Sequence, residues 1–328
     1  MNSPIAIVTG GAGFIGSYVV DILLDSDFEV RVIDNLSGGH ERNLAHRASD
    51  SRLHFEKTDI CNLETNNSLF HRAKFVFHFA GIGDIVPSIE NPIAYMQTNV
   101  QGTVRVLEAS RSARVEKFVY AASSSCYGLA TTPTNEDHNI APQYPYALSK
   151  YQGEQAVFHW HQVYGLPVNS IRIFNAYGTR VRTTGAYGAV FGVFLKQKLS
   201  GKPYTVVGNG NQTRDFIYVT DIAKAFLAAA QTPRFGQVYN VSAGEPKSIN
   251  NLVDFLGGEI VYIPERPGEP DCTWADIKKI TTELAWQPTV SFEEGISMMQ
   301  AEIENWQDAP LWDPKSIETA TKTWFQYM

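Results

Sequence analysis

The segment whose side chains are best suited to catalyse a reaction is Tyr146-Ala-Leu-Ser-Lys150. Residues four apart lie on one face of a helix, so Lys150 can place its ammonium near the Tyr146 hydroxyl. A tyrosine with an ordinary pKa of about 10 is a poor base at neutral pH, but a fixed cation stabilises phenolate and lowers that pKa. Such a pair can take a proton from an alcohol while hydride leaves its carbon. Because the spacing also occurs by chance on helix surfaces, its context must support it.

A glycine-rich turn near the N-terminus supplies that context. The apolar run Ile5–Thr9 is followed by Gly10, Gly13 and Gly16 at the spacing G-x-x-G-x-x-G, where a helix begins. Backbone N–H groups and the helix N-terminus can then face a pyrophosphate. Asp34 ends the next apolar run, 18 residues after Gly16, where a carboxylate would meet ribose hydroxyls and repel a 2′-phosphate. The sequence therefore predicts a site for NAD rather than NADP.

Bulk composition narrows the class of protein. The chain has 328 residues, a formal charge of −7 and a pI near 5.6, which argues against broad binding to nucleic acids or anionic membranes. An anionic ligand would therefore need a local group of arginines. Cys61, Cys126 and Cys272 are odd in number and far apart, so neither a disulfide framework nor a metal site is expected. No leader or membrane span is recognisable, and we expect a cytoplasmic protein.

Six short apolar runs alternate with helical segments in the first half of the chain. This alternation predicts an α/β fold, a doubly wound parallel (Rossmann) sheet of order 3-2-1-4-5-6 with helices on both faces. We expect an NAD-binding domain over residues 1–175 and a smaller α/β substrate lobe over 176–328, with some segments interleaved. The six runs are Ile5–Thr9, Glu29–Asp34, Leu53–Asp59, Phe75–Ala80, Lys117–Ser123 and Val168–Asn175.

The elements expected in the second lobe are shorter and separated by glycine-rich loops. We expect the last helix to be structural, with Ile317, Ala320, Trp324 and Phe325 buried on one side. The expected helices lie near 190–200, 220–230, 249–256, 274–284, 292–305 and 315–327. The expected strands are 204–207, 237–240 and 259–263.

Two long helices are predicted over 92–113 and from about 146 to 164. Asn99 and Gly102 are poor helix-interior residues, so the first helix is expected to pass close to a group that needs a polar contact and little bulk. Both helices carry apolar residues on more than one face. That pattern would suit a homodimer through these helices, although burial against the sheet explains much of it.

Several loops at the predicted carboxyl ends of the strands contain residues that could have either a cofactor-binding role or a local structural role. Asp59 could hydrogen-bond an adenine amino group or could cap a turn. Gly81 and Gly83 could admit a cofactor close to the backbone, or could belong to a tight loop.

The chain resembles the extended short-chain dehydrogenase/reductase family, and within it the nucleotide-sugar epimerases typified by UDP-glucose 4-epimerase. The resemblance covers residues 5 to about 295. Its carriers are TGGAGFIGS, Asp34-Asn35, HFAG from His78, NVQGT from Asn99, SSSCYG, YALSK, IFNAYGTR, TRDFIYVTD and RPGEP.

This resemblance implies roles for individual residues. Tyr146 would act as base and then acid, Lys150 would hold the nicotinamide ribose, and Ser123 would bond the reacting hydroxyl; these three form the expected catalytic set. The implied NAD contacts are Gly10, Gly13, Phe14, Ile15, Gly16, Asp34, Asn35, Asp59, Ile60, Phe79, Ala80, Gly81, Asn99, Tyr146, Lys150 and Phe174. The implied substrate contacts are Ser88, Ser123, Ser124, Ser125, Tyr146, Asn175, Val190, Arg214, Arg266 and Glu269.

The residues after Ser123 discriminate among the reactions of this family. Ser124 and Ser125 stand where 4,6-dehydratases place Asp and Glu, and Cys126 is one residue late for the acid/base Cys of epimerase-reductases. The resemblance therefore implies 4-epimerisation of a UDP-hexose, UDP-glucose or UDP-galactose, through a 4-keto intermediate. A nucleotide-sugar dehydrogenase, reductase or dehydratase remains an alternative. A redox-sensing binding module of the same fold would usually have lost the Tyr or the Lys of this motif, whereas Tyr146 and Lys150 are both present here.

Two departures from the family pattern bear on specificity. Thr273 stands where galactose-specific enzymes often carry a bulky Tyr, so the site could also admit the 2-acetamido group of UDP-GlcNAc or UDP-GalNAc, unless Trp274 fills that space. Gly83 replaces a Lys found in some members, which removes one possible contact to the cofactor pyrophosphate.

Overall fold

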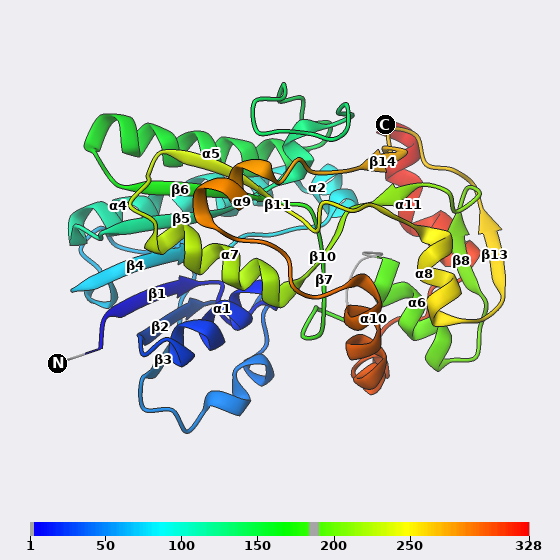
Figure 1. The fold of residues 1–328 in the computed structure, drawn as a ribbon, viewed down its shortest axis with the longest axis horizontal. Coiled ribbons are helices and arrows are strands. Elements are labelled where there is room, and N and C mark those ends of the chain that lie inside the picture. The colour runs from blue at the N-terminus through cyan, green and yellow to red at the C-terminus, as the bar shows by residue number, and fades with distance from the viewer. Residues whose placement is uncertain (1–2, 184–189, 328) are drawn as a thin grey trace.

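The computed structural model describes residues 3–183 and 190–327 and confirms the predicted α/β class. Its main sheet has seven parallel strands in the order β11-β6-β5-β4-β1-β2-β3, which contains the predicted 3-2-1-4-5-6 arrangement (Figure 1). The carboxyl ends of β1 and β4 adjoin at the point where the strand order reverses, where such sheets form their ligand crevice. The seven strands are β1 (Ile5–Thr9), β2 (Glu29–Asp34), β3 (Leu53–Lys57), β4 (Ala73–His78), β5 (Lys117–Ser123), β6 (Val168–Ile173) and β11 (Gln237–Val241).

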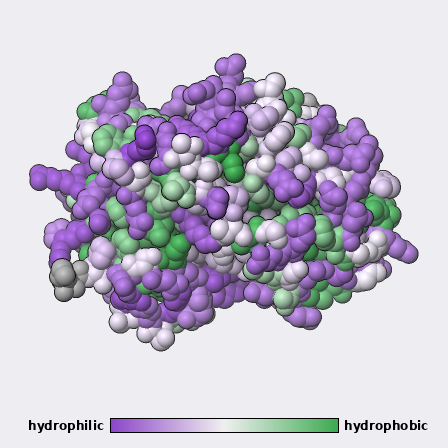
Figure 2. All heavy atoms as spheres, viewed as in Figure 1, coloured by the Kyte–Doolittle hydropathy of each residue, from purple (hydrophilic) through white to green (hydrophobic). Residues whose placement is uncertain are grey.

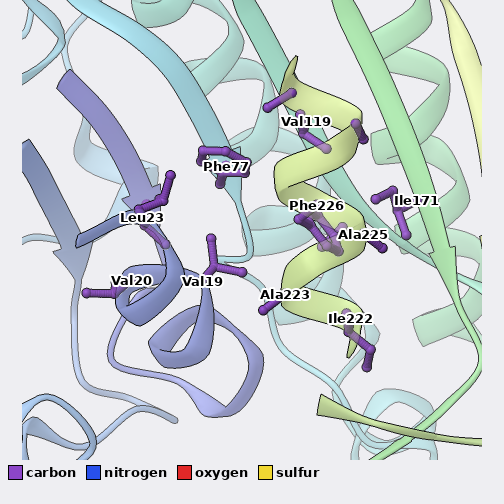
Figure 3. Close-up of a cluster of buried hydrophobic side chains, with 14 of the residues drawn as sticks. Val19, Val20, Leu23, Phe77, Val119, Ile171, Ile222, Ala223, Ala225 and Phe226 are labelled. Atoms are coloured by element: carbon purple, nitrogen blue, oxygen red, sulfur yellow. The ribbon is translucent and has the colours of Figure 1, made fainter. Parts of the chain in front are cut away.

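Helices cover both faces of this sheet. On one face α1 (Phe14–Asp25) packs beside α7 (Val219–Gln231), and their apolar side chains meet those of the sheet (Figure 3). On the other face α4 (Thr103–Ala113) and α5 (Pro145–Tyr164) bury residues such as Val157, which is fully buried. These two apolar layers fix the positions of the loops at the strand ends.

A smaller group of elements packs beyond the sheet, around a second apolar cluster (Figure 1). On the face shown in Figure 2, hydrophilic residues prevail and apolar residues lie among them. The remaining helices are α2 (Ile85–Glu90), α3 (Pro92–Met96), α6 (Val190–Leu199), α8 (Ile249–Leu256), α9 (Lys278–Leu284), α10 (Phe292–Ala301) and α11 (Pro314–Tyr327). The remaining strands are β7 (Asn175–Tyr177), β8 (Tyr204–Val207), β9 (Thr213–Arg214), β10 (Phe216–Tyr218), β12 (Lys247–Ser248), β13 (Ile260–Ile263) and β14 (Cys272–Thr273).

One strand lies in a different place from the one expected. β11 pairs in parallel with β6 and extends the main sheet, whereas the sequence predicted it in the smaller lobe. Its Tyr239 and Val241 join the apolar layer under α1 and α7, which explains why it belongs to the large sheet. The chain therefore returns to the main sheet after β10.

Several boundaries also differ. β6 ends at Ile173, because the next residues form β7, which pairs with β10. α9 begins at Lys278 rather than near residue 274, since the N–H of Ala275 donates to the buried carboxylate of Asp215. In α11 the Phe325 side chain is 47% exposed, so its predicted burial is wrong, whereas Ile317 and Trp324 are buried.

The first long helix is not regular. A π-helical segment, Gln97–Gly102, joins α3 to α4 and contains both residues that the sequence marked as unusual. A Cβ on Gly102 would lie 2.6 Å from the Ile60 side chain, so glycine is required there by close packing. π-helical segments occur frequently at functional sites.

Candidate active site

The glycine turn between β1 and α1 is shaped for close approach of a ligand. Gly10 has a φ of +71°, and a Cβ there would lie 2.6 Å from the backbone nitrogen of Ala80. Gly13 caps α1 with extended backbone and, having no side chain, makes no side-chain capping hydrogen bond. The N–H groups at the start of α1, including those of Phe14 and Ile15, are therefore suited to an anion. This arrangement fits the pyrophosphate of a dinucleotide.

Asp34 lies beside this turn and is held by the backbone. Its Oδ2 accepts a hydrogen bond from the N–H of Ala12 at 3.0 Å, and its Oδ1 accepts from Leu36 at 2.8 Å. Burial raises the pKa of Asp34, while these amide bonds and nearby His40 oppose the shift. Each oxygen keeps a free lone pair, so the carboxylate can accept ribose hydroxyls as the sequence predicted.

The next loops are organised around Asp59 and Asn99. Asp59 accepts from the N–H of Cys61 at 2.8 Å and from Asn35 Nδ2 at 3.0 Å, so the capping role is present and the adenine contact stays a prediction. Asn99 is buried and bonds both backbone groups of Ile82, at 2.8 and 3.0 Å. Its polar contact is therefore with the loop after β4, which it holds in place.

Ser123 ends β5 directly beside the catalytic helix. Its Oγ lies 2.8 Å from the Oγ of Ser125, and a hydrogen bond joins its hydroxyl to Tyr146. Burial raises the pKa of Tyr146, and the bond to Ser123 opposes that shift. The structure thus brings together two of the three residues of the predicted catalytic set.

Lys150 is buried near the loop after β4. Its Nζ lies 4.5 Å from the centre of the Tyr120 ring, and a Cβ built on Gly81 would approach it to 3.8 Å. Burial lowers the pKa of Lys150 to about 8, with Glu154 opposing that shift. Because burial raises the pKa of Tyr146 in the protein without NAD⁺, the lowering of that pKa stays a prediction for the complex with the cofactor.

Replacing Lys150 with Met is expected to raise the free energy of unfolding at pH 7 by about 2 kcal/mol, because burial disfavours the ammonium. The gain should be constant below the folded-state pKa of about 8 and should fade as the pH rises toward 10.5, where the unfolded lysine also becomes neutral. Urea unfolding at pH 7 and pH 10 measures it, with the same change at the exposed Lys278 as control. A Met variant that is less stable at pH 7 would contradict the expectation.

A cavity of about 450 Å³ extends from Ser123 into the second lobe. Among its lining residues, Arg214 Nη2 donates to Glu269 Oε1 at 2.7 Å, and Arg266 Nη1 lies 3.6 Å from Glu269 Oε2. Because guanidinium groups suit phosphate oxygens, this group meets the demand for local arginines in an acidic protein. The predicted contacts that line the cavity are Ser123, Ser124, Ser125, Phe174, Asn175, Val190, Arg214, Arg266 and Glu269.

Other predicted residues support the site from behind. Ser88 is fully buried and donates to the carbonyl of Ile85 in its own helix, and Phe79 packs on Phe226 with ring centres 4.4 Å apart. Asn175 Nδ2 donates to Thr273 Oγ1 at 2.7 Å, so the small residue at the predicted specificity position is held by another site residue. The structure places these side chains in supporting contacts, and their ligand roles stay predictions.

Cys126 is excluded from acid–base work by its position. It is buried with Tyr127 and Phe174, and burial raises its pKa to about 12. The chain forms a 3-10 turn at Ser124–Tyr127, so the reason is not the extended strand that the sequence suggested. Ser124 and Ser125, in contrast, face the cavity.

Tyr144, Thr321 and Trp324 are among the cavity-lining residues that the sequence analysis did not identify. Tyr144 stands next to the proline that begins α5, which was a usable signal for a fixed position. No local sequence pattern identifies Thr321 and Trp324 as cavity residues, because they lie in the last helix, which the sequence predicts to be structural. Among the described residues there is no group suited to hold a metal ion, and no helix is long and apolar enough to cross a membrane.

The glycine turn fits a dinucleotide, a carboxylate ends β2, and Ser, Tyr and Lys side chains lie beside an arginine-lined cavity. Together these features define an enzyme of the short-chain dehydrogenase/reductase type. The chain belongs to the NAD dependent epimerase/dehydratase family, whose model matches residues 6–242. NAD is accordingly its cofactor, as Asp34 predicted.

Similar proteins extend over most of the chain. A putative UDP-glucose 4-epimerase of Methanocaldococcus jannaschii is 35% identical, with 92% of this chain and 97% of the relative covered. A UDP-N-acetylglucosamine 4-epimerase of Methanobrevibacter ruminantium, solved with UDP-N-acetylmuramic acid, matches at a TM-score of 0.86 and 32% identity, over 92% and 100% of the two chains. A UDP-glucuronic acid 4-epimerase of Bacillus cereus, solved with UDP-glucuronic acid and NAD, matches at 0.86 and 32%, over 92% and 99%.

Proposed function

We propose that this protein interconverts the C4 epimers of a UDP-hexose through a 4-keto sugar. The observation that carries the proposal is one cavity lined by two chemically different groups of residues. One group is Ser123, whose hydroxyl bonds Tyr146, and the other is Arg214, Arg266 and Glu269. A neutral hydroxyl to be oxidised would fit the first group, and a diphosphate to be anchored would fit the second.

The chain's own residues would divide the work. Tyr146 takes the proton from the C4 hydroxyl and later returns it, and Ser123 holds that hydroxyl in line. Lys150 bonds the nicotinamide ribose. The two arginines hold the diphosphate while the 4-keto sugar rotates within the site. Bound NAD⁺ supplies reversible hydride acceptance, and its positive ring favours the Tyr146 phenolate that burial opposes.

Substrate choice would depend on the wall near Thr273. Its hydroxyl accepts from Asn175, which holds the side chain back at the edge of the cavity. We infer that UDP-glucose and UDP-galactose are accepted, and that a 2-acetamido group in UDP-GlcNAc or UDP-GalNAc is accommodated as well. The names of the similar proteins support a UDP-sugar but differ in the sugar.

A nucleotide-sugar dehydrogenase or reductase is the main alternative, and a dehydratase is disfavoured because Ser124 and Ser125 cannot act as acid and base at neutral pH. Incubation of the protein with a panel of nucleotide sugars, without added NAD, separates these activities. The proposal expects each active substrate to give its C4 epimer at constant nicotinamide absorbance. Only 4-keto or deoxy products, or stoichiometric NADH, would reject it.

We also propose a cytoplasmic homodimer that pairs through α4 and α5. The supporting observation is exposed apolar surface on α5, where Leu148, Val163 and Tyr164 are 37%, 53% and 52% exposed. Sedimentation at micromolar concentration tests the dimer, and a single species of 36.5 kDa would contradict it.

A further inference from the structure

The C-terminal helix α11 (Pro314–Tyr327) reaches the substrate cavity, although its sequence suggested only a structural element. Thr321 and Trp324 project from one side of α11 and line the cavity, and they are 2% and 7% exposed. Phe325, on the other side, is 47% exposed. Figure 1 shows α11 at the end of the molecule where the second lobe lies, far from the N-terminus. The buried side of the helix therefore faces the site and not only the core.

Trp324 touches the loop that carries the arginine group. Its Nε1 donates to the carbonyl oxygen of Pro267 at 2.7 Å. Pro267 stands between Arg266 and Glu269, whose charged groups lie 3.6 Å apart and adjoin Arg214. A hydrogen bond to the backbone at this point fixes the position from which both side chains project. The indole is thus linked to the residues assigned to the diphosphate.

The same indole is also connected to the catalytic residues. The Trp324 and Tyr144 ring centres are 6.3 Å apart, and Tyr144 stacks on Tyr146 at 6.4 Å with the planes 7° apart. A hydrogen bond joins the Tyr144 hydroxyl to Ser125. The row of three rings runs from α11 to the base of the proposed reaction, so Trp324 borders the space left for the sugar.

The helix itself is held firmly. Ser316 N donates to Asp313 Oδ1 at 2.7 Å and so caps its start, and Thr323 Oγ1 donates to Glu90 Oε1 of α2 at 3.0 Å. α2 in turn begins at Ile85, which lines the same cavity. α11 is therefore supported on the main body while it bounds the cavity.

We propose that α11 is part of the substrate site and that Trp324 is a positioning and specificity-determining residue. It holds the loop of Arg266 and Glu269 for the diphosphate, and its ring limits the room for substituents on the sugar. The assignment of the ligand as a UDP-sugar rests on the proposed function. Because the two contacts of Trp324 use different parts of the indole, they can be tested separately.

Trp324→Phe keeps an aromatic wall and removes the N–H donor, so it should weaken UDP binding about fivefold and leave the choice between sugars unchanged. Trp324→Ala removes both contacts, so it should also raise the kcat/KM ratio of UDP-GlcNAc to UDP-glucose at least about fivefold. Phe325→Ala, the exposed neighbour, is the matched control and should change neither quantity. Calorimetry with UDP and progress curves with the two sugars provide the readouts, and thermal unfolding confirms that each variant is folded.

The proposal is overturned if both Trp324 variants have the same UDP affinity and the same sugar preference as Phe325→Ala. If Trp324→Ala does not fold, the Trp324→Phe affinity decides alone, and an unchanged value overturns the link to the loop. A wild-type protein that binds UDP but epimerises no sugar would reject the proposed function while the affinity test of α11 remains decisive. A wild-type protein that does not bind UDP would reject both.

Discussion

Tyr146→Phe is expected to lower kcat by at least about a hundredfold while UDP affinity stays within about twofold of wild type. The change removes one oxygen, the group that bonds Ser123 and that would take the substrate proton, and general acid–base catalysis is typically worth that much. The Tyr146 ring remains to stack on Tyr144, so the site keeps its shape. Epimer formation at saturating substrate, together with UDP calorimetry, measures both quantities.

Tyr164→Phe is the matched control for this prediction. It makes the same change at the other end of α5 from Tyr146, at a side chain that is 52% exposed. Its turnover should equal that of the wild type. Near-normal turnover in Tyr146→Phe would remove Tyr146 from the mechanism, whatever the control shows.

Arg172→Met is expected to lower the free energy of unfolding by about 3–5 kcal/mol, since it leaves a buried carboxylate without its cation. Arg172 Nη2 donates to Glu154 Oε2 at 2.7 Å, and the two side chains are 6% and 3% exposed. Ser170 alone would then bond Glu154 through its hydroxyl, at 2.6 Å. Because Glu154 lies one turn after Lys150 on α5, the loss should also loosen the catalytic helix on the sheet. Urea unfolding at pH 7 measures the change.

Arg111→Met serves as the control, because it breaks an ion pair of similar geometry at the surface. Arg111 Nε lies 2.9 Å from Glu108 Oε1, with side chains 40% and 26% exposed, so its removal should cost less than about 1 kcal/mol. Adding Glu154→Gln to Arg172→Met should recover part of the loss, since the unpaired charge disappears. Equal losses in the free energy of unfolding for Arg172→Met and Arg111→Met would contradict the expectation, because the buried pair would then contribute no more than the surface pair.

The parts of the fold that depend on local patterns were predictable. β1, β2 and β5 have the predicted bounds, because continuous apolar runs ended by turn residues specify buried parallel strands. β11 is also predicted as a strand, but it pairs with β6, where Tyr239 lies opposite Ile171, 68 residues earlier in the chain. No local pattern encodes such a long-range pairing. Strands of two or three residues such as β9, β12 and β14 are too short for any periodicity to show.

The candidate site divides in the same way. Arg214 and Glu269 were named from their motifs, and the structure joins them at 2.7 Å. Burial raises the pKa of Tyr146 in the protein without NAD⁺, which the sequence could not show, because helix spacing reports which residues share a face and says nothing about desolvation. Trp324 was assigned to the core because burial against a core and burial against a cavity produce the same sequence pattern.

The central claim is that one sugar carbon is oxidised and reduced again within a single binding event. The most direct measurement follows deuterium placed at C4 of the accepted UDP-sugar, in ordinary water and without added NAD, by NMR of both epimers. The product epimer should keep the deuterium at C4. Loss of the label to water, or its appearance in released NADH, would contradict it.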